Sequence, residues 1–207
     1  LNKSFSGSGV AAAEGYVFIT KQTISTSITS IDFINGSNDV VFDSTYKTYV
    51  FQFENMVSDS GEQNMLYQAT TDGGTTWNSV SGNWVRTMPF IYEDSGAYNS
   101  NLATTTEADR NITSGWQLMG FPAVTVTGGS FSGSLYFYDP ANSSQYKVAL
   151  MIAAGVADGN GGAHWLTYGR LQPYTLMTTS AINGLKFFVS SGTIDGGDIT
   201  LFGINTG

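Results

Sequence analysis

Residues 70–77 read Thr-Thr-Asp-Gly-Gly-Thr-Thr-Trp, and no other stretch of the chain places chemistry-bearing residue types in so specific a pattern. The Asp72 carboxylate can accept hydrogen bonds from the amides of a tight turn, and the two glycines after it can adopt positive φ without steric cost. The indole of Trp77 can then fold back as a hydrophobic plug. The pattern therefore predicts a hairpin turn between the strand that ends near Thr71 and the next strand. The residues expected to form this turn are Thr70, Asp72, Gly74, Thr76 and Trp77.

The spacing T-x-D-x-G-x-T-W is also that of the Asp-box, a motif of sialidases and of several unrelated β proteins. A sialidase clamps the carboxylate of its substrate with three arginines, and this chain has three, at Arg86, Arg110 and Arg170. A propeller, however, needs several blades of about 40 residues each, which 207 residues cannot supply. The motif also occurs only once. We therefore do not expect sialidase activity.

Other catalytic patterns are equally incomplete. Glycosidases need two carboxylates roughly 5–10 Å apart, and the best pair, Glu107 and Asp109, lies among polar residues typical of a loop. His164 is the only histidine, and the chain has no G-x-S-x-G elbow for a Ser-His-Asp site. We interpret these groups as solvated acids and a packing histidine, and we expect no enzymatic activity and no cofactor.

The chain offers few metal ligands. It contains no cysteine and one histidine, which leaves no ligand set for zinc. Asp158 and Asn160 lie in a Gly-rich stretch that begins like a calcium loop, but the later bidentate glutamate of an EF-hand is missing. We expect no metal site.

Aromatic residues provide a non-catalytic alternative, because flat rings can stack on sugar rings. The candidate glycan contacts are Trp84, Tyr92 and Trp116. The competing interpretation is that each ring packs in the core or in a turn, which for Trp77 the Asp-box already explains.

Composition indicates the elements that must position these residues. The chain contains 25 Gly, 13 Phe and 11 Tyr, and only 12% of its residues are charged. Aromatic and β-branched residues fill pleated faces and glycine serves turns. We therefore predict an all-β fold, an antiparallel β-sandwich that is jelly-roll-like. The predicted strands are Tyr16–Ile24, Ser30–Ile34, Thr48–Met56, Met65–Thr71, Asn83–Met88, Trp116–Met119, Ala123–Val126, Ser130–Tyr138, Tyr146–Ile152, His164–Arg170, Leu185–Val189 and Asp198–Ile204.

Three segments depart from the strand pattern. Glu93–Gly115 is polar and rich in Asn and Thr, which predicts a long excursion from the sheet of a length typical of binding loops. Ala153–Ala163 is predicted to be a Gly-rich loop. Residues 1–15 are small and predict a flexible N-terminal arm, either loose or ordered against a neighbouring subunit through Phe5 and Val10. Residues 16–207 then form a single domain.

The charge distribution excludes two classes of partner. The net charge is −8, from 16 acidic and 8 basic residues. The bases are scattered and form no patch that could neutralise phosphates, so we expect neither nucleic-acid binding nor attachment to a membrane surface. No apolar run approaches the roughly 20 residues needed to span a bilayer.

The end of the chain carries a further pattern. Residues 181–204 read Ala-Ile-Asn-Gly-Leu-Lys-Phe-Phe-Val-Ser-Ser-Gly-Thr-Ile-Asp-Gly-Gly-Asp-Ile-Thr-Leu-Phe-Gly-Ile. Three shorter segments precede it: Ser-Ile-Asp-Phe at 30–33, Phe-Asp-Ser-Thr-Tyr at 42–46 and Tyr-Val-Phe-Gln-Phe at 49–53. This ending and opening, with the Asp-box turn between them, resemble a group of virion structural proteins from tailed bacteriophages, many of them marine. Order and spacing agree from about residue 16 to 204, most weakly across 90–120.

The resemblance implies a β-sandwich virion component and no catalytic chemistry. Since the chain is little more than an arm and one domain, without the heptads or β-helical repeats of fibres, we expect an outer-capsid decoration or cement protein. By the symmetry of such assemblies it is expected to be homotrimeric and to contact the major capsid protein. The first alternative is a tail-fibre, adaptor or receptor-binding module that engages host glycans. The second is a free carbohydrate-binding module or glycosidase.

Overall fold

The computed structural model describes residues 15–59, 63–77, 82–94, 97–107, 116–123, 130–155, 157–159, 163–165, 170–176 and 178–205. Within these ranges it describes side chains at 15–59, 65–77, 130–155, 175–176 and 178–205. All secondary-structure elements assigned within these ranges are β-strands. The strands are β1 (Gly15–Ile24), β2 (Ser30–Ile34), β3 (Thr48–Ser58), β4 (Gln63–Thr70), β5 (Gly82–Asp94), β6 (Ala97–Glu107), β7 (Trp116–Ala123), β8 (Phe131–Tyr138), β9 (Lys147–Gly155), β10 (Ala157–Gly159), β11 (Ala163–Trp165), β12 (Arg170–Leu176), β13 (Gly184–Val189) and β14 (Ile194–Asn205).

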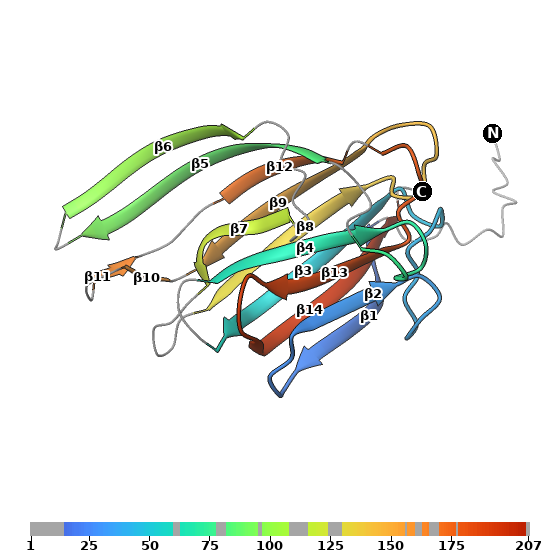
Figure 1. Ribbon diagram of the computed structural model, residues 1–207, viewed down its shortest axis with the longest axis horizontal. Coiled ribbons are helices and arrows are strands. Elements are labelled where there is room, and N and C mark those ends of the chain that lie inside the picture. Colours follow the sequence, from blue (N-terminus) through green and yellow to red (C-terminus); the bar gives the residue numbers. More distant parts are fainter. Residues whose placement is uncertain are drawn as a thin grey trace, which may run out of the picture.

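Most strands belong to two antiparallel sheets that form two layers (Figure 1). The large sheet has eight strands in the order β1-β14-β3-β8-β9-β12-β5-β6, and the small sheet has four in the order β2-β13-β4-β7. β10 and β11 form a separate short pair. The first and last strands lie side by side, with Gly15 opposite Asn205, so both ends of the described chain meet at one edge of the large sheet. This arrangement confirms the predicted all-β antiparallel sandwich.

Aromatic side chains fill the space between the sheets. Each strand turns alternate residues toward the other layer, so Phe51 and Phe53 of β3 meet Phe187 of β13 with ring centroids 5.2 and 5.1 Å apart. Phe33 of β2 completes the group, 5.2 Å from Phe51. The pairs are edge-to-face, a geometry that contributes about 0.5–1.5 kcal/mol each beyond the burial of area. These rings join the two sheets into one core.

Most predicted strands coincide with observed ones, but the prediction of a long excursion from the sheet at Glu93–Gly115 is wrong over residues 93–94 and 97–107, the part of it that the structure describes. Residues Ala97–Glu107 form β6, which pairs with β5 from Asp94 opposite Ala97 to Trp84 opposite Glu107. Sequence reasoning missed β6 because its Asn and Ala residues have low strand propensity, whereas an antiparallel ribbon supplies the hydrogen bonds through the backbone.

Two further boundaries need correction. The predicted Gly-rich loop Ala153–Ala163 holds the end of β9, β10 and the first residue of β11. The predicted strand His164–Arg170 is instead the end of β11 and the start of β12, which continues to Leu176. The sequence patterns predicted no strand over residues 171–176, where β12 holds Pro173, a residue without the amide donor of a ladder. In the predicted strand Ala123–Val126, only Ala123 lies within the described residues, as the last residue of β7.

Candidate functional site

The Asp-box turn is organised around the hydroxyl of Thr70. This side chain is fully buried at the end of β4. Its Oγ1 donates to Asp72 Oδ1 at 2.7 Å and accepts the amide of Gly74 at 3.0 Å. A third, longer bond comes from the Asp72 amide at 3.3 Å. One hydroxyl therefore satisfies both its donor and its acceptor capacity inside the turn.

The Asp72 carboxylate closes the second half of the turn. Its Oδ1 accepts the amide of Thr76 at 2.9 Å. The hydrogen bonds from Thr76 and then Thr70 lower the pKa of Asp72 below its usual value, because they stabilise the charged form. The carboxylate thus serves as a fixed acceptor of turn hydrogen bonds.

The two glycines and Trp77 shape the outer surface of the turn. Gly73 and Gly74 have φ of 72° and 88°, values that other residues rarely adopt. A Cβ on Gly74 would lie 2.7 Å from Ile34 Cδ1 and 3.3 Å from Trp77 Cζ2, so Ile34 and the indole would have to shift to admit a larger residue. Lys186 Nζ lies 4.3 Å from the centroid of the Trp77 ring, a cation–π contact.

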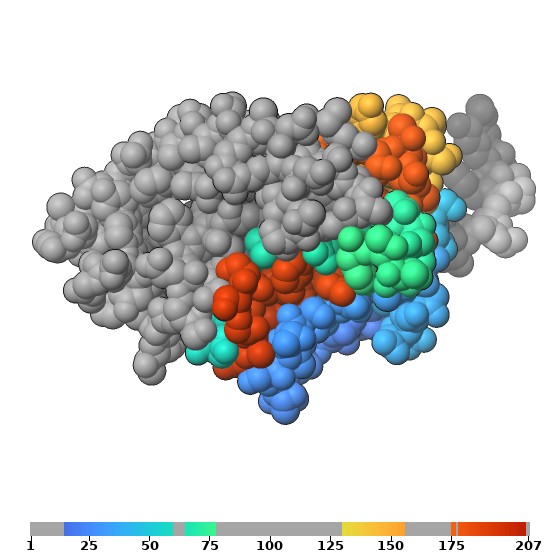
Figure 2. Space-filling view, viewed as in Figure 1, coloured from blue at the N-terminus to red at the C-terminus, as the bar shows by residue number. Residues whose placement is uncertain are grey.

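The turn is not part of a hairpin, contrary to the sequence prediction. β4 pairs with β13 and β7 in the small sheet, while β5 belongs to the large sheet. The segment after Thr70 therefore begins a crossover from one layer to the other. In Figure 2 the green surface around residues 70–77 adjoins β13 in red and β2 in blue.

Asn183 ties the Asp-box to the end of the chain. Its Oδ1 accepts the amide of Gly73 at 3.0 Å, and its Nδ2 donates to the carbonyl of Thr71 at 3.2 Å. Its backbone amide donates to the carbonyl of Thr70 at 3.0 Å. The turn is thus held from outside by the residue that precedes β13.

The segments at 42–46 and 181–204 are also in direct contact. Gly203 of β14 lies against the Tyr46 ring so closely that a Cβ there would clash with three ring atoms. Tyr46 in turn packs edge-to-face on Tyr49, with ring centroids 5.7 Å apart. We call segments 30–33, 42–46, 49–53, 70–77 and 181–204 the framework segments, because their inward-facing side chains meet in the core and the turns. The term leaves out their residues on the outer face of the large sheet, Val50, Gln52 and Phe202.

A different surface lies on the outer face of the large sheet. Tyr16 and Phe18 of β1 are 56% and 60% exposed, and both rings pack edge-to-face on Phe202 of β14. The register of the ladders continues this row from Phe202 through Val50 to Tyr136 of β8. Val50 is only 1% exposed although it lies outside the core between the sheets. Val50 is thus shielded from solvent at a position where its ladder neighbours are Phe202 and Tyr136.

The apolar character extends along β8 and β9. Tyr138, Val148 and Ile152 are also among the exposed large hydrophobic residues of the described chain. The Tyr16 and Tyr136 hydroxyls form a hydrogen bond of 3.0 Å across the face. This bond is the first cause of a raised pKa for Tyr16. We call the residues Tyr16, Phe18, Tyr136, Tyr138 and Phe202 the aromatic platform.

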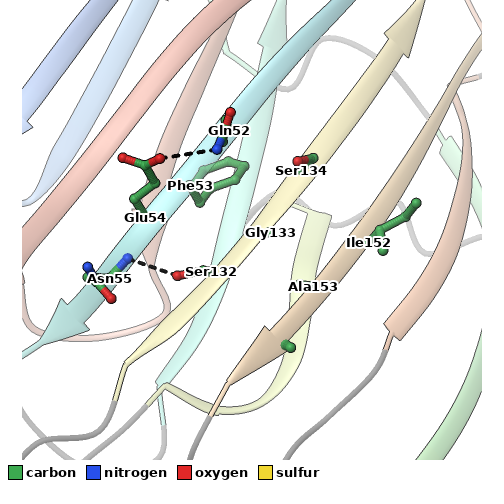
Figure 3. Close-up of a pocket in the computed structure, with 10 residues that line it drawn as sticks. Gln52, Phe53, Glu54, Asn55, Ser132, Gly133, Ser134, Ile152 and Ala153 are labelled. Atoms are coloured by element: carbon green, nitrogen blue, oxygen red, sulfur yellow. Dashed lines mark hydrogen bonds between the residues drawn. The ribbon is translucent and has the colours of Figure 1, made fainter.

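Next to the aromatic platform the same face holds a shallow groove with a volume of about 650 Å³ (Figure 3). Its floor consists of small residues on β8 and β9, from Ser132 to Ser134 and at Ala153 and Ala154. Its rim on β3 is polar. Gln52 Nε2 donates to Glu54 Oε1 at 3.1 Å, and the Asn55 amide donates to Ser132 Oγ at 3.0 Å.

Paired bulges shape the end of the groove. Asn55 has a φ of 50°, and the ladder between β3 and β8 shifts register between Phe53 and Met56. On β14, Gly197 has a φ of 115°, and a Cβ there would lie 2.8 Å from the Glu54 carbonyl oxygen. Bulges of this kind re-aim side chains. Here the bulge leaves Asn55 exposed at the groove.

Lys147 is a buried titratable group with a structural role. It is only 1% exposed, and its Nζ donates to the carbonyls of Gln145 at 2.8 Å and Thr179 at 3.4 Å. Burial lowers the pKa of this amine, since desolvation disfavours its charged form. The two carbonyl bonds connect the segment before β9 to the segment after β12.

The predicted glycan contacts lie on strands whose side chains fall outside those that the structure describes. Trp84 and Tyr92 lie on β5 and Trp116 begins β7, in different sheets. Glu107 ends β6 opposite Trp84, while Asp109 and Arg110 lie outside the described residues, as do Phe5, Val10 and Asn160. Asp158 pairs with His164 in the β10–β11 ladder. Among the residues with described side chains, no three His, Cys, Asp or Glu groups could hold a metal ion together.

Sequence reasoning missed the aromatic platform, although a signal was present. Residues 135–138 read Leu-Tyr-Phe-Tyr, an apolar run in which both faces of the strand are hydrophobic. The alternation predicts one buried face, and the structure shows that the other face carries two tyrosines, the partly buried Tyr136 and the exposed Tyr138. The rings on β1, β8 and β14 lie on one face because of the order of the strands in the sheet. Local sequence patterns do not reveal this order.

Comparison with known protein families finds none that matches the chain, and a search of curated proteins finds no significant match. Within the part of the chain that is described, no helix is long and apolar enough to cross a membrane.

Proposed function

We propose that this protein is a non-enzymatic structural protein of a bacteriophage virion, an outer-capsid decoration or cement protein that forms homotrimers and contacts the major capsid protein. The observation that carries the proposal is the mutual contact of the framework segments. These are the segments that resemble phage virion proteins, and their residues supply the core and the turns.

Two contacts between distant segments support this reasoning. The Asp-box is held by Asn183 of the ending, and Tyr46 of the opening covers Gly203 of the ending. The residues that carry the resemblance therefore pack on each other, which supports extending the resemblance from single segments to the sandwich that they build. The function that follows from it is mechanical, namely a stable domain that needs no cofactor.

Two carboxylates outside the Asp-box are also engaged in hydrogen bonds of turns and loops, which suits a structural role. Asp139 accepts hydrogen bonds from Asn142 at 3.0 Å and Lys47 at 3.1 Å, and its pKa is lowered mainly by the first. Asp43 accepts the Thr45 amide at 2.7 Å and also has a lowered pKa. Carboxyl groups with lowered pKa values stay ionised near neutral pH and are poor general acids.

Cryo-EM of purified virions with counting of this protein per particle tests the proposal. A decoration protein is expected in hundreds of copies arranged on the shell with three-fold contacts. About a dozen copies at the tail would instead support the adaptor or receptor-binding alternative, which the exposed aromatic platform favours. Absence from purified particles would overturn both.

Deletion of residues 1–15 tests how the protein attaches. This segment, apart from Gly15, lies outside the described residues, and it leads into β1 at one edge of the large sheet. We expect the truncated protein to bind the shell more weakly. Unchanged occupancy on the particle would show that the arm is not needed for attachment.

A further inference from the structure

We propose that the outer face of the large sheet binds a neutral glycan chain, with sugar rings stacked on the aromatic platform and hydroxyls bonded in the adjacent groove. The proposal concerns a site that the sequence did not indicate. It does not depend on where the protein sits on the particle.

The aromatic platform supplies the stacking surface. Tyr16 and Phe18 expose more than half of their surface, and Tyr138 exposes 39%. The edge-to-face contacts with Phe202 and the hydroxyl bond between Tyr16 and Tyr136 restrain these rings before any ligand arrives. Restrained rings lose little conformational entropy on binding. The tyrosine hydroxyls also supply polar groups at the edge of the platform.

The groove supplies hydrogen-bonding groups beside that surface. Gln52 and Glu54 are joined by one bond of 3.1 Å, so the amide keeps its carbonyl oxygen and the carboxylate its second oxygen as acceptors. The Ser134 hydroxyl stands opposite Gln52 in the ladder, and both point to the groove (Figure 3). Sugar hydroxyls both donate and accept, and therefore complement this mixture.

The spacing between the aromatic platform and the groove suits a chain of sugar units. Tyr136 and Ser134 are two residues apart on β8, on the same face, which corresponds to about 7 Å along a strand. The opposing residues on β3, Val50 and Gln52, repeat this step. A ligand that stacks at the Tyr136 row therefore reaches the groove within one or two units. The groove volume of about 650 Å³ lies in the range of small-molecule sites.

Charge selects a neutral ligand over an acidic one. Lys21 and Asp198, on the neighbouring strands, pair with each other at 2.9 Å. Glu54 is then the one acidic or basic residue among those that line the groove. A sialylated or phosphorylated chain would meet this negative charge without a free cation among those lining residues. Protein interface cores are enriched in Tyr and Phe, as the aromatic platform is, but they are depleted in charged residues such as the glutamate of this groove.

An array of neutral oligosaccharides of hexoses and N-acetylhexosamines, with sialylated chains for comparison, tests the proposal on the full chain. Glycans that bind are then titrated by calorimetry against the wild type, Phe18→Ser, Gln52→Ala and Gln68→Ala. Gln68 lies on β4 in the small sheet, opposite Lys186, so Gln68→Ala makes the same chemical change as Gln52→Ala away from the groove.

We expect the wild type and Gln68→Ala to bind a neutral glycan equally, while Phe18→Ser and Gln52→Ala each weaken binding by about ten-fold or more. No binding at millimolar sugar, binding only to sialylated chains, or equal affinity in all four proteins would overturn the proposal. Self-association of the wild type that Phe18→Ser abolishes would also overturn it, by assigning the face to a second copy. None of these results changes the copy number on virions, so the two proposals fail separately.

Discussion

The framework segments and the outer face of the large sheet use the same residue types in opposite ways. In the framework, the Thr70 hydroxyl and the Asp72 carboxylate bond within the turn, and phenylalanines such as Phe187 are fully buried. On the outer face, Phe18 is 60% exposed, and the Gln52–Glu54 pair borders an open groove. The polar groups of the Asp-box, the motif that suggested chemistry in the sequence, are thus used in hydrogen bonds within the turn. The strand face that carried no motif has polar and aromatic groups that a ligand could contact.

The largest expected effect is at the centre of the framework. Phe187→Ala removes a ring that packs on Phe51 at 5.2 Å and Phe53 at 5.1 Å, and it leaves a cavity between the sheets. We expect the free energy of unfolding to fall by about 3–5 kcal/mol, measured by urea denaturation followed by tryptophan fluorescence. A loss below about 1 kcal/mol would contradict the assignment of this ring to the core.

A smaller loss is expected at the Asp-box. Thr70→Val keeps the shape of the side chain but leaves the Gly74 and Asp72 amides without their acceptor, at a cost of about 1–3 kcal/mol. Thr71→Val is the matched control, since no hydrogen bond of the Thr71 hydroxyl is found among the described residues. If both variants unfolded at the same denaturant concentration, the turn would not depend on Thr70.

The Asp72 carboxylate predicts a pH dependence with a definite sign. Its folded-state pKa is lowered by the Thr76 and Thr70 bonds, so its contribution is complete above the unfolded pKa of about 4 and disappears as the pH falls through the lower folded value. Asp72→Asn should therefore be less stable than the wild type near neutral pH and approach it on acidification. Urea midpoints of both proteins at a series of pH values measure this. A gap that widens as the pH falls would refute the assignment.

The smallest change in stability is expected on the outer face. Phe18→Ser removes an exposed ring that packs edge-to-face on Phe202, and we expect the free energy of unfolding to change by no more than about 1 kcal/mol. The same urea series measures it beside Phe187→Ala. A loss as large as that of the buried ring would mean that the outer face also serves as core.

Much of the fold was predictable from local patterns, and the site was not. Alternation along residues 49–53 and the Thr, Asp and Gly types at 70–77 predicted β3 and the turn, because strand faces and turn chemistry are local properties. The prediction of a hairpin was wrong because strand pairing depends on the sheet order, which places β13 beside β4. The aromatic platform was missed for the same reason, since Tyr16 and Tyr136 are 120 residues apart and meet only in the folded sheet.

The division between framework and binding face is tested most directly by comparing two variants, Thr70→Val and Gln52→Ala. For each, the free energy of unfolding and the affinity for the glycan are measured on the same preparation. We expect Thr70→Val to lose stability and, while folded, to bind the array-selected neutral glycan as the wild type does. Gln52→Ala should keep its stability and bind about ten-fold more weakly. If folded Thr70→Val lost binding while Gln52→Ala retained it, the Asp-box would be the binding site and the division between framework and binding face would be wrong.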